Sequence, residues 1–341
     1  MKLLVLGGTR FLGRHIAELA LARGHVLTLL HRGRSGPTLF PQAEHRIADR
    51  DDAVALSAAL AGGSWDAAID TSAYVPRQVR SVAAALGTRL AHYQLVSSIS
   101  VYDSFDGPGA AEDSATRTLP DPMVETVTGD TYGGLKALCE QAALAAFGAR
   151  CLVNRPGLLV GPHDPTGRFT WWMQRLQRGG TVLAPGDPDT PVQFIDARDA
   201  AAWMLQQAER ATAGVFNLTG PAQPLTMAGF LATARDTLNP GATLAWVGER
   251  FLLEQGVAPW SDLPVWLPHA EAGLHRTRIQ RALDTGLHCR PLAQTLLDTA
   301  QWAAGADPQA APAGALARPA PGLTPEREAA LMAGWTGHGR S

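Results

Sequence analysis

A tyrosine and a lysine stand four positions apart in the segment YGGLK, residues 132–136. On a helix, residues i and i+4 share one face, so both side chains can point at one ligand. An ammonium close to a phenol stabilises the tyrosinate, which lowers the pKa of the tyrosine and lets it exchange protons near neutral pH. A serine at the end of a predicted strand can hold a hydroxyl or carbonyl group in place. We therefore predict Tyr132 and Lys136, with a serine from the segment SSIS at 97–100, as a proton-transfer set.

A glycine-rich turn, GGTRFLG at residues 7–13, is the second chemical signal. It follows the apolar residues 2–6 and precedes helical spacing over residues 11–23. Glycines at such a turn let backbone N–H groups approach a pyrophosphate, and the helix N-terminus attracts the phosphates. We therefore expect a nicotinamide dinucleotide to bind here. The predicted contacts in the turn are Gly7, Gly8, Thr9, Arg10, Phe11, Leu12 and Gly13.

Arginines after the second predicted strand favour one dinucleotide. An NAD-specific fold usually has an acidic residue about 20 positions after the turn, which binds the ribose 2′-hydroxyl. This chain has Arg32 and Arg34 there and no acid. A guanidinium suits a 2′-phosphate, and Arg10 could bind it from the other side. We predict NADP(H) in preference to NAD(H); the alternative is that these arginines are solvated surface charges.

The elements that must position these residues alternate between strands and helices. Such alternation with short connections is typical of a doubly wound parallel sheet. We predict an α/β protein: a Rossmann-type doubly wound parallel sheet with a smaller C-terminal substrate lobe. The sequence indicates strands at 2–6, 26–30, 45–48, 67–70, 93–97 and 151–154, and helices at 11–23, 52–60, 77–86 and 132–147.

Beyond residue 156 the alternation loosens and prolines become frequent. We predict a dinucleotide-binding domain at 1–157, with a returning segment near 190–218, and a substrate-binding lobe at 158–302. Residues 303–341 are predicted to form an Ala/Pro-rich linker and a short terminal helix.

Composition excludes several classes of protein. The net charge of −2 favours neither nucleic acid nor an anionic membrane as a partner. The sequence contains no uninterrupted run of about 20 apolar residues, so we expect no membrane span. The three cysteines are odd in number and far apart, which fits no disulfide framework, so we expect the protein in a reducing cytoplasm. Neither the cysteines nor the histidines have metal-ligand spacing, so we expect no metal site.

Several motifs together resemble the short-chain dehydrogenase/reductase superfamily, in its extended or atypical branch of the NAD(P)-dependent epimerase/dehydratase type. The resemblance runs from residue 1 to about 199, with weaker similarity to about 297. The segments that carry it are GGTRFLG (7–13), ADRD (48–51), SSISVY (97–102), YGGLK (132–136), NRPGLLVGP (154–162) and QFIDARD (193–199).

The resemblance implies roles for individual residues. Tyr132 would donate or accept the proton, Lys136 would hold the nicotinamide ribose, and Ser98 would be the catalytic serine. Arg10 departs from the family, which usually has glycine there. Residues 70–74 also replace the usual apolar-Ala-Ala segment. The other implied cofactor contacts are Asp49, Arg50, Thr71, Ser72, Ala73, Arg155 and Pro156.

Five further residues are candidates for binding a small-molecule substrate. Packing or surface roles remain alternatives for each of them, as in a surface turn at residue 163 or a lobe core around residue 168. The candidates are Tyr74, Ser100, His163, Arg168 and Gln193.

Two functions follow from these expectations. The first is an NAD(P)-dependent oxidoreductase or epimerase/dehydratase, acting on a hydroxyl or carbonyl substrate such as a nucleotide sugar. The alternative is a non-catalytic dinucleotide sensor or RNA-binding protein, because GGTRFLG also resembles a subgroup that includes chloroplast stem-loop RNA-binding proteins. An intact Ser98, Tyr132 and Lys136 set favours the enzyme. Dimers through two long helices are common in the resembled family, so the resemblance allows a homodimer, and the sequence leaves the oligomeric state open.

Overall fold

A computed structural model of the chain describes residues 1–107, 109–305 and 320–336. Its centre is a seven-stranded sheet made of β1 (Lys2–Leu6), β2 (Val26–His31), β3 (Glu44–Ile47), β4 (Trp65–Asp70), β5 (Leu90–Val96), β6 (Cys151–Pro156) and β11 (Gly214–Leu218). The strand order is β11-β6-β5-β4-β1-β2-β3, and every neighbouring pair is parallel. The predicted doubly wound α/β fold is confirmed.

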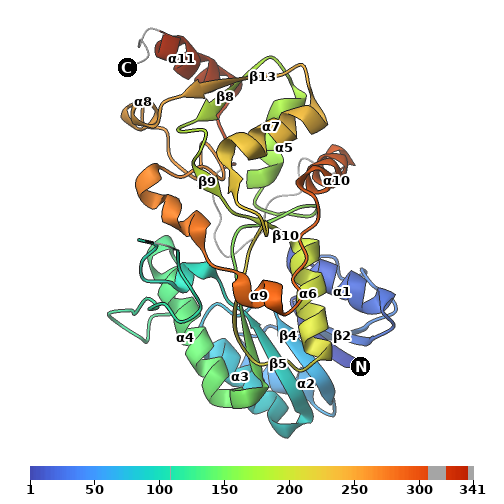
Figure 1. Cartoon of the computed structure of the whole chain (residues 1–341). Coiled ribbons are helices and arrows are strands. Elements are labelled where there is room, and N and C mark those ends of the chain that lie inside the picture. Colours follow the sequence, from blue (N-terminus) through green and yellow to red (C-terminus); the bar gives the residue numbers. More distant parts are fainter. Residues whose placement is uncertain (108, 306–319, 337–341) are drawn as a thin grey trace.

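Helices cover both faces of this sheet, as Figure 1 shows. Successive side chains of a strand point to opposite faces. In β1, Leu3 and Val5 pack with α1 and α6, while Leu4 and Leu6 pack with α2, α3 and α4. Fully apolar strands are therefore needed, because neither face meets water. The helices are α1 (Phe11–Ala22), α2 (Ala53–Leu60), α3 (Pro76–Leu86), α4 (Gly129–Phe147) and α6 (Ala197–Glu209).

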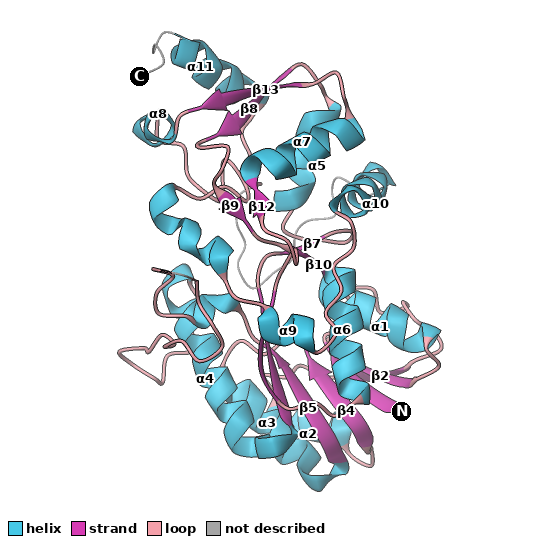
Figure 2. Cartoon of the chain, in the orientation of Figure 1, coloured by secondary structure: helices cyan, strands magenta, loops and turns pink. Residues whose placement is uncertain are grey.

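A second group of elements lies at the end of the sheet where its strands finish (Figure 2). Its core includes the fully buried rings of Trp172, Phe230 and Trp266. Three two-stranded sheets, β7–β10, β8–β13 and β9–β12, support it. The elements are β7 (Leu159–Val160), α5 (Arg168–Gln177), β8 (Thr181–Pro185), β9 (Pro191–Val192), β10 (Ile195–Asp196), β12 (Leu225–Thr226), α7 (Met227–Leu238), β13 (Thr243–Val247), α8 (Glu249–Glu254), α10 (Leu292–Gly305) and α11 (Pro325–Thr336). The short helix α9 (Gln280–Asp284) instead packs on β11 of the central sheet.

The C-terminal segment agrees in part with its prediction. The expected terminal helix is α11, and Glu328 anchors it through Arg175 Nε at 2.5 Å and the Leu183 N–H at 2.9 Å. Residues 306–319 of the predicted linker lie outside the described residues. Within the described part, no helix is long and apolar enough to cross a membrane.

Candidate active site

The glycine turn joins β1 to α1 by close backbone packing. Gly7 has a φ of 91°, which favours glycine. A Cβ on Gly8 would lie 2.5 Å from Leu29 Cδ2, and a Cβ on Gly13 would lie 2.2 Å from the Gly7 oxygen. Arg10 is the N-cap of α1 and makes no side-chain capping bond, and no acid occupies the first turn. The amide groups that begin α1 are therefore suited to an anion.

Three arginines at this edge have no partner among the described residues. The side chain of Arg10 is half-buried in the turn, while Arg32 and Arg34 are exposed just after β2. None of the three makes a side-chain hydrogen bond or an ion pair within the described part of the chain. The Gly33 N–H donates to His31 Nδ1 at 3.0 Å, which shapes the loop that carries two of them. These guanidinium groups are free to bind an anionic ligand.

Arg50, a predicted cofactor contact, lies in a buried ion pair. Its Nη1 and Nη2 each lie 2.7 Å from an oxygen of Asp70, whose carboxylate also accepts the Tyr93 hydroxyl at 2.9 Å. Burial opposes both charges, yet mutual attraction raises the pKa of Arg50 and lowers that of Asp70. Within the Arg50 guanidinium, the Nε is the one nitrogen that has no hydrogen-bond partner among the described residues. The ion pair supports the end of β4, and a cofactor contact by Arg50 stays a prediction.

The segment after β4 lies against the glycine turn. Thr71 Oγ1 donates to the Leu6 carbonyl at 2.8 Å, which ties residues 71–73 to the end of β1. Asp49 is half-buried, and its carboxylate accepts the N–H of residue 51 at 3.1 Å. Both strand ends thus bring predicted contacts to one edge of the sheet.

Helix α4 is pressed against the short 3₁₀ helix Ile99–Val101. Thr128 and Thr131 form a reciprocal cap at the start of α4: each backbone N–H donates to the hydroxyl of the other residue, at 2.9 and 3.2 Å. A Cβ on Gly133 would lie 2.2 Å from the carbonyl oxygen of Ser100. The glycine after the tyrosine therefore permits the contact that brings α4 to the end of β5.

Ser98 and Lys136, two of the predicted catalytic residues, lie at the ends of β4 and β5, and Tyr132 precedes Lys136 by one turn of α4. Burial raises the pKa of Tyr132, and a hydrogen bond with Ser98 opposes that rise. Lys136 is 4% exposed, and its Nζ donates to the carbonyls of Ala73 at 2.7 Å and Val96 at 2.5 Å. Ser98 thus lies near enough to the phenol to act on its pKa, and the ammonium lies one helical turn further along α4.

The charge of Lys136 acts on a different phenol from the one expected. We expected the ammonium to lower the pKa of Tyr132, but that pKa is raised because burial dominates. The two carbonyls hold Nζ 5.6 Å from the centre of the Tyr74 ring. Burial raises the pKa of Tyr74, and Lys136 opposes this rise.

Arg155, predicted beside the nicotinamide, points into a buried polar cluster. Its Nε and Nη2 bind Glu140 at 3.0 and 2.7 Å, and its Nη1 binds the Tyr102 hydroxyl at 3.0 Å. Ser97 Oγ donates to the same Glu140 at 2.5 Å. Sequence reasoning missed Glu140, although it lies four positions after the predicted lysine on the same helix. Contacts of Arg155 and the buried Pro156 with a cofactor stay predictions.

Two predicted substrate residues, Tyr74 and Ser100, lie beside the proton-transfer set. The rings of Tyr74 and Tyr132 have their centres 6.4 Å apart, and Ser98 Oγ donates to Ser100 Oγ at 3.1 Å. These residues share one surface at the sheet edge.

Two others, Arg168 and Gln193, are linked through His275 in the second group of elements. The Gln193 N–H donates to His275 Nδ1 at 3.0 Å, and its buried Oε1 has no partner among the described residues. The Trp260 ring lies 5.9 Å from His275, and the Arg168 guanidinium lies 5.8 Å from the Trp260 ring.

His163 packs elsewhere, against α1 and α10. Its ring centre lies 5.7 Å from His15 and 5.4 Å from Trp302. Burial and the charge of Arg14 lower the pKa of His163 to about 4. Packing therefore explains its position, and a substrate contact stays a prediction.

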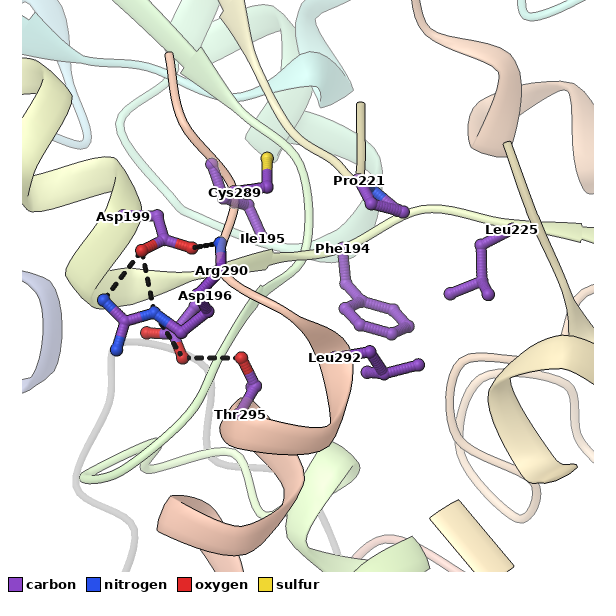
Figure 3. Close-up of a pocket in the computed structure, with 10 residues that line it drawn as sticks. All are labelled: Phe194, Ile195, Asp196, Asp199, Pro221, Leu225, Cys289, Arg290, Leu292 and Thr295. Atoms are coloured by element: carbon purple, nitrogen blue, oxygen red, sulfur yellow. Dashed lines mark hydrogen bonds and ion pairs between the residues drawn. The ribbon is translucent and has the colours of Figure 1, made fainter. Parts of the chain in front are cut away.

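Figure 3 shows a small pocket between α6 and the segment that leads into α10. Arg290 Nε binds Asp199 at 2.7 Å, and Thr295 Oγ1 donates to Asp196 at 2.9 Å. None of the predicted site residues lines it. Across the described residues, no cluster of three or more His, Cys, Asp or Glu could hold a metal ion.

Comparison with protein families adds independent information. A model of the NAD dependent epimerase/dehydratase family matches residues 3–219. The chloroplast stem-loop binding protein of 41 kDa b from Arabidopsis thaliana is 25% identical over 234 residues. That match covers 64% of this chain and only 58% of the Arabidopsis protein.

Solved structures share the fold at low sequence identity. A UDP-glucose 4-epimerase from Thermus thermophilus in complex with NAD has a TM-score of 0.65 at 17% identity, and the match covers 90% of this chain and 100% of that one. A UDP-glucuronic acid 4-epimerase from Bacillus cereus in complex with NAD has a TM-score of 0.64 at 15% identity, with 89% and 96% covered.

Proposed function

The chain belongs to the NAD-dependent epimerase/dehydratase family, and on that premise we propose that it is an NAD(P)-dependent enzyme acting on a hydroxyl or carbonyl of a small molecule. The observation that carries the proposal is the placement of Lys136, whose Nζ is held at the ends of β4 and β5, one helical turn after Tyr132 and beside the segment that packs on the glycine turn. A nucleotide sugar is the first substrate class to test.

The chain's own residues fit a bound dinucleotide. The turn glycines allow the tight backbone that a pyrophosphate can approach closely, and the free Arg10 supplies a cation there. When bound, the cofactor accepts or donates a hydride at its nicotinamide ring. Ser98 Oγ orients the substrate oxygen, and the Tyr132 hydroxyl donates or removes the proton at that oxygen. The remaining proton of the Lys136 ammonium is free for a ribose hydroxyl.

Substitution of the phenol tests this assignment. We expect Tyr132→Phe to lower turnover by about 10²- to 10⁴-fold, the usual contribution of a general acid or base, with nearly normal cofactor binding. Lys136→Ala should damage both, because its ammonium also anchors two backbone carbonyls. Equal losses of cofactor binding and turnover in Tyr132→Phe would make this tyrosine structural and overturn the proposal.

We propose NADP(H) as the preferred cofactor, supported by the unpartnered Arg32 and Arg34 after β2. Titration of Arg32→Ala and Arg34→Ala with NADPH and NADH separates the two cofactors. Each substitution should weaken NADPH binding about 10-fold or more, as expected for a charge-assisted contact, and leave NADH nearly unchanged. Unchanged NADPH affinity in both variants contradicts the preference.

The reaction type is a separate proposal within the same site. A simple reductase consumes added NADPH in proportion to product, whereas an epimerase or dehydratase retains its cofactor through the cycle. Mass spectrometry of ligands that co-purify with the native protein distinguishes these cases. A tightly retained dinucleotide supports the second.

RNA binding is the second candidate function, favoured by the similarity to the Arabidopsis stem-loop binding protein. The net charge of −2 and the complete Ser98, Tyr132 and Lys136 set argue for the enzyme. If Tyr132→Phe leaves every cellular role intact, RNA or dinucleotide binding without catalysis becomes the better reading. A cytoplasmic location stays a prediction.

We also propose a homodimer through α3 and α4. Met123 and Leu144 are 80% and 40% exposed, and Pro76, Leu138 and nearby alanines line a shallow groove between the helices. Light scattering at several protein concentrations tests this. A monomer at every concentration contradicts it.

A further inference from the structure

Tyr74 combines a fixed backbone with a free hydroxyl. Its N–H donates to Gln78 Oε1 at 2.8 Å, and the preceding segment is tied to the buried Asp70 through the Ser72 N–H at 3.1 Å. Its side chain is half-buried, and its hydroxyl makes no hydrogen bond within the described part of the chain. The phenol is therefore held in position without a protein partner for its polar end.

The Lys136 ammonium lies over the ring of this phenol. Its Nζ is 5.6 Å from the ring centre, a cation–π arrangement. Burial raises the pKa of Tyr74, and the charges of Lys136, Arg10 and Arg50 each oppose that rise. The segment before Tyr74 is tied to the end of β1 through Thr71 Oγ1 and the Leu6 carbonyl at 2.8 Å, and the Tyr74 ring centre lies 6.4 Å from that of Tyr132. Tyr74 therefore lies between the glycine turn and the proton-transfer set.

A hydroxyl among cations suits a ligand that carries phosphate and ribose oxygens. A dinucleotide that spans from the glycine turn to Tyr132 has to pass this position. We propose that Tyr74 binds the dinucleotide through its hydroxyl, between the glycine turn and Lys136, with its ring against the Lys136 ammonium. This inference rests on the proposed function and adds a residue to the cofactor site of this chain.

Tyr74→Phe tests the hydroxyl, because the ring and its packing remain. Isothermal titration with NADPH and NADH should show affinity for the preferred cofactor about 5- to 10-fold weaker than in the wild-type protein, as expected for one lost hydrogen bond. Thr233→Val is the control for the loss of one hydroxyl, because Thr233 Oγ1 donates to the Gly229 carbonyl at 2.8 Å within α7, in the second group of elements. That variant should bind the cofactor like the wild-type protein.

The ring contact has its own measurement in the cofactor-free protein. Nuclear magnetic resonance of labelled tyrosine, assigned with Tyr74→Phe, reports ionisation of the Tyr74 phenol. Its pKa should rise in Lys136→Met, and an unchanged pKa overturns the ring contact.

The two proposals fail in different ways. If the wild-type protein binds the cofactor and Tyr74→Phe binds it equally well, only the role of Tyr74 is overturned. If the wild-type protein binds neither NADPH nor NADH, the proposed function fails and this inference fails with it.

Discussion

Gly133 offers a direct test of how α4 is placed against the end of β5. A Cβ at this position would lie 2.2 Å from the Ser100 carbonyl oxygen, which is backbone and cannot rotate away. In Gly133→Ala, either α4 or the 3₁₀ helix Ile99–Val101 must therefore shift. Because Tyr132 precedes the glycine and Ser98 precedes this 3₁₀ helix, the shift moves the two apart.

The size of the effect follows from two opposing contributions. Alanine in place of glycine inside a helix stabilises by up to about 1 kcal/mol. Overpacking against fixed atoms costs about 1–3 kcal/mol, and the contact with backbone puts this site in the upper part of that range. We expect a net loss of about 1–2 kcal/mol in unfolding free energy. Displacement of a catalytic group by about 1 Å can cost about 10²-fold in turnover.

Two glycines on the same helix provide matched controls. A Cβ on Gly129 would meet no atom within 4 Å, so Gly129→Ala should be neutral or slightly stabilising. A Cβ on Gly134 would meet the Leu119 side chain at 2.5 Å, and because that side chain can move, the loss should be intermediate.

Urea unfolding and turnover, measured on all three variants, check this ranking. We expect Gly129→Ala to be the most stable, Gly134→Ala to be intermediate and Gly133→Ala to be the least stable, with a large loss of turnover confined to Gly133→Ala. If Gly133→Ala is as stable and as active as Gly129→Ala, the reasoning from the backbone contact is refuted.

Two further predictions concern buried carboxyl groups. Glu140→Gln leaves the Arg155 charge buried without a counter-ion, so we expect a loss of about 3–5 kcal/mol in urea unfolding, and an unchanged midpoint contradicts the ion pair's role. Burial raises the pKa of Asp164 to about 6, despite opposing hydrogen bonds from Thr166, and the unfolded value is about 3.9. Because the folded state binds this proton more tightly than the unfolded state, the protonated Asp164 carboxyl contributes its full stabilisation below about pH 4. That stabilisation is lost as the pH rises through about 6. Asp164→Asn should match the wild-type stability near pH 4 and exceed it by up to about 3 kcal/mol above about pH 7; a pH-independent difference contradicts this.

Local patterns in the chain were sufficient for the sheet and for part of the site. Strand β1 is apolar at every buried position because helices cover both faces of the sheet. The apolar run at residues 2–6 was therefore enough to predict a buried strand. Tyr132 and Lys136 share a helix face because their spacing matches its period. Strand β11 of the central sheet was not predicted, and neither were the small strands β7 to β10, β12 and β13. These are runs of two to five residues in the part of the chain where strands and helices no longer alternate regularly.

The partners of the charged residues could not be read from local pattern. Arg10 and Arg50 each lie within a motif that was predicted to bind the cofactor. Arg50 is paired with the Asp70 carboxylate, 20 residues away, whereas the Arg10 side chain has no hydrogen-bond or ion-pair partner among the described residues. Arg155 is likewise paired with Glu140, 15 residues earlier. Nothing in the spacing distinguishes a buried arginine from a free one.

The amino-acid sequence by itself determined the strand and helix order as far as residue 156, the need for glycine at residues 7, 8 and 13, and the shared face of Tyr132 and Lys136. These depend on steric limits and periods that act over a few residues. Tertiary structure alone decided which arginines remain free for a ligand and that the Lys136 charge acts on Tyr74. Electrostatic partnership depends on distance in space and on burial, and both arise only when strands far apart in the chain meet at one edge of the sheet.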